Sequence, residues 1–192
     1  RLANTAVNKK DAFTSLNGLM ESYYLLAQYD SSERYALQVQ RMGSVNVNAA
    51  SKASLFLGKI AKARGDYETA KDEFIATFNA AQDEYGAEAK YLLAEIFFLR
   101  GDHTMCRETL ISLNQDFATY EDWVGKSFLL LAEDYLATKE VFQAKGTLRS
   151  LIENFPKAEV RDLAAERLKA IEASEQKREQ ELIRKDSTDR KP

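Results

Sequence analysis

Short motifs recur along this chain at a nearly constant spacing. Leu-Leu-Ala-Glu occupies residues 92–95 and returns at residues 130–133, 38 positions later. Arg-Gly-Asp occupies residues 64–66 and returns at residues 100–102, 36 positions later. Self-similarity with a period in the thirties indicates stacked structural repeats. Such a stack presents an extended surface to another molecule and has no obvious centre at which chemistry would be concentrated.

The composition predicts that the repeated unit is helical. The 192 residues include only two prolines and eight glycines, and 45% are hydrophobic, which is enough for a substantial core. The rest is rich in Ala, Leu, Glu, Lys and Gln, which lose little side-chain freedom in a helix. We therefore expect an all-α fold.

The net charge and the length of the apolar stretches argue against two kinds of interaction, with nucleic acid and across a membrane. The net charge is −3, without the basic excess typical of nucleic-acid binding, so we expect no nucleic-acid partner. The longest apolar stretch, residues 91–99, is interrupted by Glu95 and is too short to span a membrane. Cys106 is the only cysteine, so an internal disulfide is excluded and the redox compartment stays open.

Apolar residues at three- and four-residue spacing predict a series of helical hairpins. The four hairpins are expected at about residues 11–42, 49–83, 86–117 and 122–156. A capping helix at residues 158–171 would seal the stack with Val160, Leu163, Ala164, Leu168 and Ile171. The charged segment 172–192 either prolongs this helix into solvent or is disordered. Since the chain starts at Arg1 and not at methionine, residues 1–10 are interpreted as a truncated lead-in.

The turns inside two hairpins carry Gly-Asp, at residues 65–66 and 101–102. Glycine can adopt the left-handed conformation that ends a helix, and aspartate can cap the start of the next one. The fourth hairpin has Lys139-Glu140 at this place.

These hairpins resemble the tetratricopeptide repeat, a unit of about 34 residues built from two antiparallel helices. The fourth hairpin fits best, with Phe128, Leu131, Ala132 and Tyr135 in the first-helix positions, Ala144, Leu148 and Leu151 in the second, and Pro156 at the end. The resemblance implies a right-handed α-α superhelix of stacked hairpins with the C-terminal capping helix. Small residues such as Gly58, Ala94 and Ala132 would let helix backbones approach closely. Cys106 takes the position of Ala70 and Ala144, which favours a small buried residue over a nucleophile.

Residues 86–95, with 142–145 and 154–156, also resemble the C-terminal part of large tetratricopeptide proteins of Bacteroidetes. Those proteins are generally exported, so this resemblance implies a bacterial cell-envelope or periplasmic location. Composition leaves the location undetermined, and a cytoplasmic one is the alternative.

In this family the first helix of each hairpin lines the concave face of the superhelix, so the resemblance also implies a site. First-helix residues outside the packing stripes would contact a partner: Asn17, Glu21, Tyr24, Lys52, Lys59, Lys62, Glu88, Tyr91, Glu95, Phe98, Lys126 and Glu133, with Leu129 and Leu136. Tyr91 and Phe98 either anchor the partner or pack against neighbouring first helices. One subclass grips a terminal carboxylate with paired Lys and Asn. Here the corresponding positions hold Asn17 and Glu21, then Leu55 and Lys59, so this clamp is absent.

The residues give little support to catalysis. His103 is the only histidine and lies just past a turn, where we expect it to be exposed, so no His-His metal pair is possible. Acidic neighbours such as Glu133 and Asp134 point about 100° apart on a helix and do not form an acid-base couple. We expect no enzyme activity, no metal and no cofactor.

The predicted function is that of a non-catalytic protein-interaction module that forms part of a larger envelope protein. A partner's helix or extended segment would dock in the concave groove, and the partner would be a protein or peptide. Two alternatives stay open: a structural spacer or self-association domain, and a helical accessory domain of an enzyme whose catalytic part lies elsewhere. The oligomeric state is not predicted.

Overall fold

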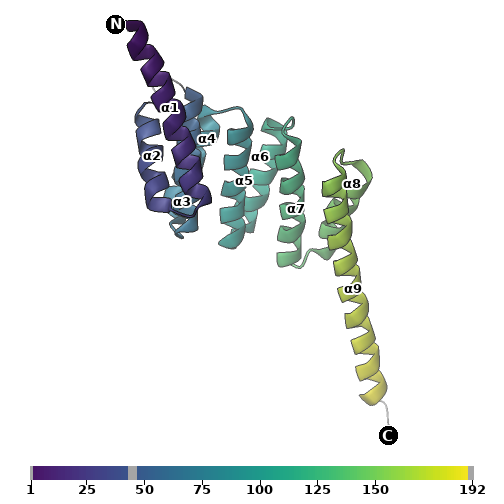
Figure 1. Ribbon diagram of the computed structural model, residues 1–192. Helices are drawn as coiled ribbons and strands as arrows, with labels where there is room; N and C mark the ends of the chain where they lie inside the picture. Colours follow the sequence, from purple (N-terminus) through teal and green to yellow (C-terminus); the bar gives the residue numbers. More distant parts are fainter. Residues whose placement is uncertain (1, 43–46, 190–192) are drawn as a thin grey trace. The chain divides into compact units, whose positions relative to one another are not determined.

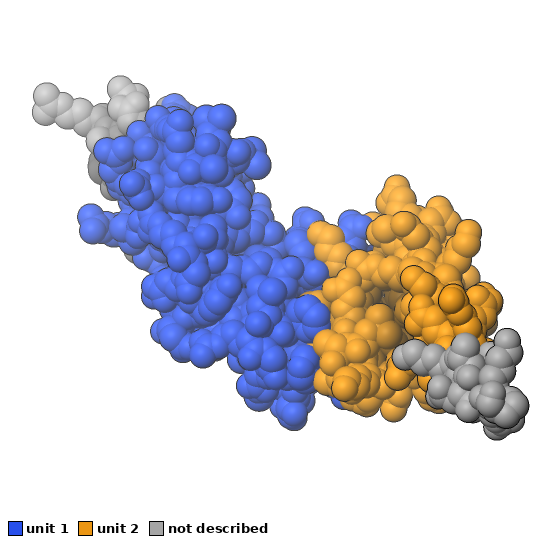
Figure 2. Space-filling model, turned by 90° about the horizontal axis from the view of Figure 1, so that it is seen from below, with its two compact units in different colours: residues 1–123 blue, residues 124–192 orange. Residues whose placement is uncertain are grey.

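The computed structural model describes residues 2–42 and 47–189, with side chains described for residues 11–42 and 50–184. Within these ranges all regular secondary structure is helical and no strand occurs, which confirms the all-α prediction (Figure 1). The chain divides into two compact units, residues 1–123 and 124–192 (Figure 2). None of the described helices has the length and apolar character needed to cross a membrane.

Unit 1 is a row of antiparallel helices in which each helix packs on the next. Its helices are α1 (Leu2–Leu25), α2 (Tyr29–Arg41), α3 (Val47–Ala63), α4 (Tyr67–Ala80), α5 (Glu84–Leu99) and α6 (His103–Asp116). Helix α3 also contacts α1 and α5, so these odd-numbered helices form a layer of their own. We call α1, α3, α5, α7 and α9 the first helices.

Unit 2 contains most of α7 (Glu121–Ala137), together with α8 (Val141–Asn154) and α9 (Ala158–Asp189). Its core joins Ala132 of α7, Leu148 and Leu151 of α8, and Ala164 and Ile171 of α9. Helix α9 is longer than the predicted capping helix and continues through the charged segment to Asp189. Residues 157–191 contain neither proline nor glycine, so nothing in that sequence ends the helix.

The small residues of the predicted packing pattern are buried where helices cross. Gly58, Ala94 and Ala132 each lie under a neighbouring helix, and the last two are at most 1% exposed. Cys106 is fully buried, as its alignment with Ala70 and Ala144 predicted. Large side chains such as Phe74, Leu110 and Leu148 fill the space beside them.

Three glycines form a recurrent pairing with phenylalanine rings. A Cβ atom on Gly58 would lie 2.6 Å from the Phe74 ring. One on Gly86 would lie 3.0 Å from Phe117, and one on Gly125 would lie 3.1 Å from Phe155. The absence of a side chain lets each ring press against a helix backbone, which fixes how the two helices approach.

The Gly-Asp turns adopt the predicted caps. Gly65 and Gly101 have φ angles of 79° and 75°. Asp66 accepts a hydrogen bond from the Thr69 amide at 3.2 Å, and Asp102 accepts one from the Met105 amide at 3.2 Å. The aspartates thus satisfy backbone donors at the starts of α4 and α6 that have no partner within the helix.

Three details differ from the sequence predictions. Helix α1 begins at Leu2 and not near Asp11, because residues 2–10 contain no proline or glycine to interrupt it. Leu163 is 46% exposed, since its neighbour Ala164 points into the core and successive helical side chains diverge by about 100°. Leu129, placed on the partner face by its register, is only 6% exposed and belongs to the core of unit 2.

Candidate partner-binding face

Besides Leu129 and Leu136, twelve contact residues were predicted, and all of them lie on first helices. Ten of them belong to unit 1: Asn17, Glu21 and Tyr24 on α1, Lys52, Lys59 and Lys62 on α3, and Glu88, Tyr91, Glu95 and Phe98 on α5. Lys126 and Glu133 lie on α7 in unit 2. We call the side of unit 1 that carries the ten residues the first-helix face.

Most of the charges on this face form ion pairs between neighbouring first helices. Glu21 of α1 pairs with Lys52 of α3. Across the next helix crossing, Lys59 pairs with Glu88 and Lys62 pairs with Glu95. The lysines of α3 therefore pair with the glutamates of α1 and α5. These charges compensate one another before any partner binds.

The ion pairs are combined with aromatic rings. The Lys59 Nζ lies 5.9 Å from the Tyr24 ring centroid and 5.0 Å from that of Phe56. Tyr24 meets Phe56 edge to face, with centroids 5.2 Å apart. Burial raises the pKa of Tyr24, and the nearby Tyr29 and Glu88 raise it further.

A surface pocket of about 460 Å³ opens between these residues. Tyr24, Lys59, Lys62 and Glu88 line it, and all four were predicted contact residues. Leu99, at the end of α5, forms part of its wall and is 57% exposed. The remaining lining residues are Ala63, Tyr67 and Leu92. The pocket thus joins apolar surface with three charged residues that are already in ion pairs and with two tyrosines.

The sequence prediction missed Leu99, Leu92 and Tyr67. Tyr67 starts α4, a second helix, so the rule that contacts come from first helices excluded it. Leu99 precedes the Arg-Gly-Asp turn and stands outside the packing stripe of α5. A large apolar residue outside the stripe at a helix end was the signal that could have identified it.

Tyr91 and Phe98 have aromatic neighbours. The Tyr91 ring lies 5.5 Å from Trp123, at the start of the next first helix. The ring centroids of Phe98 and His103 are 6.4 Å apart. His103, the first residue of α6, packs edge to face against the Phe98 ring. For Tyr91 this contact favours packing between first helices, one of the two interpretations of its role. For both residues the role in partner binding stays a prediction.

In unit 2, Glu133 pairs with Arg167 of α9, and Lys126 is exposed. A second pocket, of about 490 Å³, lies between α7, α8 and α9. Its wall includes Leu136, Val141, Leu148 and Ile171, with Glu133, Arg167, Glu175 and Arg178 among its charged residues. Leu136, predicted from its register to face a partner, thus lines an open cavity.

Comparison with known proteins agrees with this architecture. Residues 126–158 match the tetratricopeptide repeat family. The crystal structure of tetratricopeptide-like repeats from a putative kinesin light chain of Podospora anserina is similar, with a TM-score of 0.65 at 17% identity, covering 91% of this chain and 92% of that one. Two structures of MamA have TM-scores of 0.59 and 0.56 at 18% identity, covering 89% and 84% of this chain and 96% and 97% of theirs. No curated protein matches the chain. At these identities the likeness shows the fold, that of stacked tetratricopeptide-like hairpins.

Proposed function

We propose that this chain is a non-catalytic protein-interaction module that docks a partner's helix or extended segment on its first-helix face. Repeats of this fold generally serve as scaffolds for protein partners. The docking site is centred on the pocket bounded by Tyr24, Lys59, Lys62, Glu88 and Leu99. The observation that carries the proposal is the convergence of these residues, from three first helices, on one open cavity.

The chemistry of the pocket indicates what a partner segment needs. Leu99 and Leu92 offer apolar surface, so a large apolar side chain of the partner would gain most by entering there. Lys59 and Glu88 are 17% and 18% exposed and already paired. A charge inserted into the pocket would compete with an existing ion pair, so we expect apolar or aromatic anchors in the partner.

A selection from a random peptide library tests this proposal. Peptides of about 16 residues, long enough to cross several repeats as a helix or strand, are selected on the purified protein. Their dissociation constants are then measured for the wild type, for Leu99→Asp and for a matched control, Ile111→Asp. Leu99 and Ile111 are similarly exposed, at 57% and 50%, but Ile111 lies on the second helix α6.

The proposal predicts that selected peptides bind Leu99→Asp at least about tenfold more weakly, the loss expected when an apolar anchor at an interface is removed. Ile111→Asp should bind them like the wild type. Equal binding to all three proteins, or failure of the selection to yield any binder, would contradict docking in this pocket.

The cellular setting is proposed on the sequence resemblance to exported Bacteroidetes proteins, which supports a place in the bacterial cell envelope. Fractionation of cells that carry the tagged full-length protein checks it. Recovery in the cytoplasmic fraction would refute the envelope location and leave the docking proposal untouched.

A further inference from the structure

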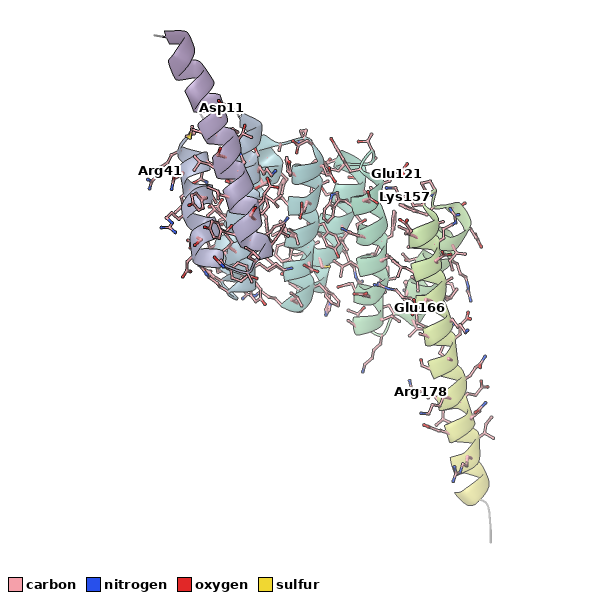
Figure 3. The ribbon with its side chains drawn as sticks, in the orientation of Figure 1. Asp11, Arg41, Glu121, Lys157, Glu166 and Arg178 are labelled. Carbon is pink, nitrogen blue, oxygen red and sulfur yellow. The ribbon has the colours of Figure 1, made fainter. Side chains whose placement is uncertain are left out.

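The distal half of α9 carries an ordered seam of side chains. Ile171, Glu175, Arg178 and Leu182 follow one another at spacings of four, three and four residues. This alternation places them on one side of a helix and is the spacing that two helices use to pack along a shared seam. At 1.5 Å per residue the seam is about 16 Å long. Figure 3 shows Arg178 on the part of α9 that extends past α8.

The same seam begins inside unit 2. Ala164, Leu168 and Ile171 continue it toward the start of α9, where they pack in the core formed with α7 and α8. Beyond Ile171, Arg149 and Lys145 of α8 pair with Glu172 and Glu175, and residues 173–184 are exposed. Leu182 and its neighbour Ile183 are 61% and 63% exposed, and Arg178 is exposed as well.

The order of residue types along this seam is self-complementary. It runs apolar, acidic, basic, apolar from Ile171 to Leu182. When a second copy runs antiparallel, each Glu175 lies opposite an Arg178 and each Ile171 opposite a Leu182. The seam of a coiled coil consists of alternating a and d positions of the heptad, and in an antiparallel pair each a position faces a d position of the other helix. The spacing places Ile171 and Arg178 at d positions and Glu175 and Leu182 at a positions, so the pairs above have this arrangement.

We propose that two copies of this chain associate through α9, antiparallel, about a two-fold axis passing between Gln176 and Lys177. Two symmetric ion pairs, Glu175 with Arg178 of the second copy and the reverse, fix the register. The proposal rests on α9 and unit 2, so it is independent of peptide docking on unit 1.

The pocket in unit 2 provides the apolar contact. Ile171 lies in its wall beside Leu136 and Val141, and the cavity has a volume of about 490 Å³. Leu182 of the second copy, opposite Ile171, reaches this cavity and exchanges water for apolar neighbours. Because the contact is isologous, the same exchange happens twice.

Existing contacts of Glu175 are compatible with this arrangement. Its carboxylate accepts a hydrogen bond from Lys145 of α8 at 2.7 Å, which holds the side chain in place. A carboxylate has about four acceptor sites, so it can receive an arginine of the second copy while it keeps Lys145. One helical turn earlier, Arg149 holds Glu172 in a similar way.

Charge reversal tests both the association and its register. The mass in solution is measured by sedimentation equilibrium at about 100 µM protein, where a micromolar dissociation constant gives mostly dimer. The proteins are the wild type, Glu175→Arg, Arg178→Glu, the double variant with both changes, and Lys177→Glu as a control. Lys177 is exposed on the other side of the same helix, and its change of charge equals that of Arg178→Glu. Circular dichroism shows that each variant is folded.

The proposal predicts a mass of twice 21.7 kDa for the wild type and for Lys177→Glu. Each single variant at the seam should have a dimer dissociation constant at least about tenfold higher than that of the wild type, because two ion pairs become two like-charge contacts. A 1:1 mixture of Glu175→Arg and Arg178→Glu should restore the dimer, since the two seams are then wholly basic and wholly acidic. The double variant should also dimerise.

Three results would overturn the proposal. The wild type could be monomeric throughout, the seam variants could dimerise as well as Lys177→Glu does, or the mixture could stay monomeric. The last result would refute the antiparallel register even if the single variants dissociate.

Discussion

Gly86 lies where the start of α5 passes the Phe117 ring and the Ala81 carbonyl group, and it shows how much one missing methyl group matters. A Cβ atom there would collide with both groups. We expect Gly86→Ala to lower the free energy of unfolding by about 1–3 kcal/mol through overpacking. Gly146, exposed on α8, has no heavy atom within 4 Å of the corresponding position. Gly146→Ala should therefore raise stability by about 0.5–1 kcal/mol.

Urea unfolding of both glycine variants checks this prediction. A neutral or stabilising effect of Gly86→Ala would show that α5 and Phe117 do not approach each other as described. The sequence alone did not reveal the pairing, because it joins residues far apart in the chain and depends on how α5 and α6 are positioned. It did predict that Gly58 allows close approach, since Gly58 aligns with Ala94 and Ala132 in the repeat.

Lys90 is a second residue whose role only the structure reveals. It is 7% exposed, pairs with Asp116 and lies 5.2 Å from the Phe78 ring centroid. Hydrogen bonds from Lys90 and then from Ser112 lower the pKa of Asp116 below its ordinary value of 3.8. The stability gained from this pair is therefore present above pH 3.8 and is lost as the pH falls through the lower pKa of the folded protein.

We expect Asp116→Asn to destabilise the protein by about 1 kcal/mol at pH 7, the upper range for a pair with one exposed partner. The difference from the wild type should begin to shrink as the pH falls below about 3.8 and should disappear below the lowered pKa of Asp116, where the aspartate is neutral in the folded protein as well. Thermal unfolding across this pH range measures it. The control is Glu172→Gln, whose pair with Arg149 is exposed on both sides and should matter little. A difference for Asp116→Asn that is independent of pH would contradict the role of this charge.

The turns between helices show which local features the repeat pattern predicts and which it does not. The Gly-Asp sequence predicted both a left-handed residue and an N-cap, because each residue type has a specific conformational use. In the fourth hairpin Lys139 adopts the same left-handed conformation, with φ of 65°, although it carries a side chain. Glu140 follows it without a side-chain capping bond to α8. The tertiary structure here imposes a conformation that the local sequence does not favour.

Lys139→Gly should therefore stabilise the protein by about 1 kcal/mol, because glycine tolerates positive φ. The reciprocal change, Gly65→Ala, places a side chain at φ of 79° and should cost a similar amount. Differential scanning calorimetry of the two variants gives the comparison. A lower melting temperature for Lys139→Gly would mean that the lysine makes contacts worth more than its backbone strain.

The sequence does not determine where α9 ends. Its distal half lacks the broad apolar stripe from which helical packing is normally inferred. High helix propensity and the absence of proline or glycine allow it to continue, and contacts from Lys145 and Arg149 hold its middle against α8.

For the whole molecule, the all-α fold with stacked hairpins followed from the period and from the large-small packing pattern. The first-helix face could be predicted in part from the sequence, because the residues that pack in the core also define which side of each helix is uncovered. The pairing of Lys59 with Glu88 did not follow, since it depends on the offset between α3 and α5. The pocket was missed for the same reason, because Leu99 and Tyr67 reach it from different helices.

Docking of partners on the first-helix face of unit 1 is the proposal on which the function of this chain rests. Its most direct test is the titration of isotope-labelled protein with a selected peptide, followed by amide chemical shifts in NMR spectra. We expect the largest changes at the pocket residues Tyr24, Lys59, Glu88, Leu92 and Leu99. Changes confined to the second helices, around the exposed residues Ile75 of α4 and Ile111 of α6, would contradict it.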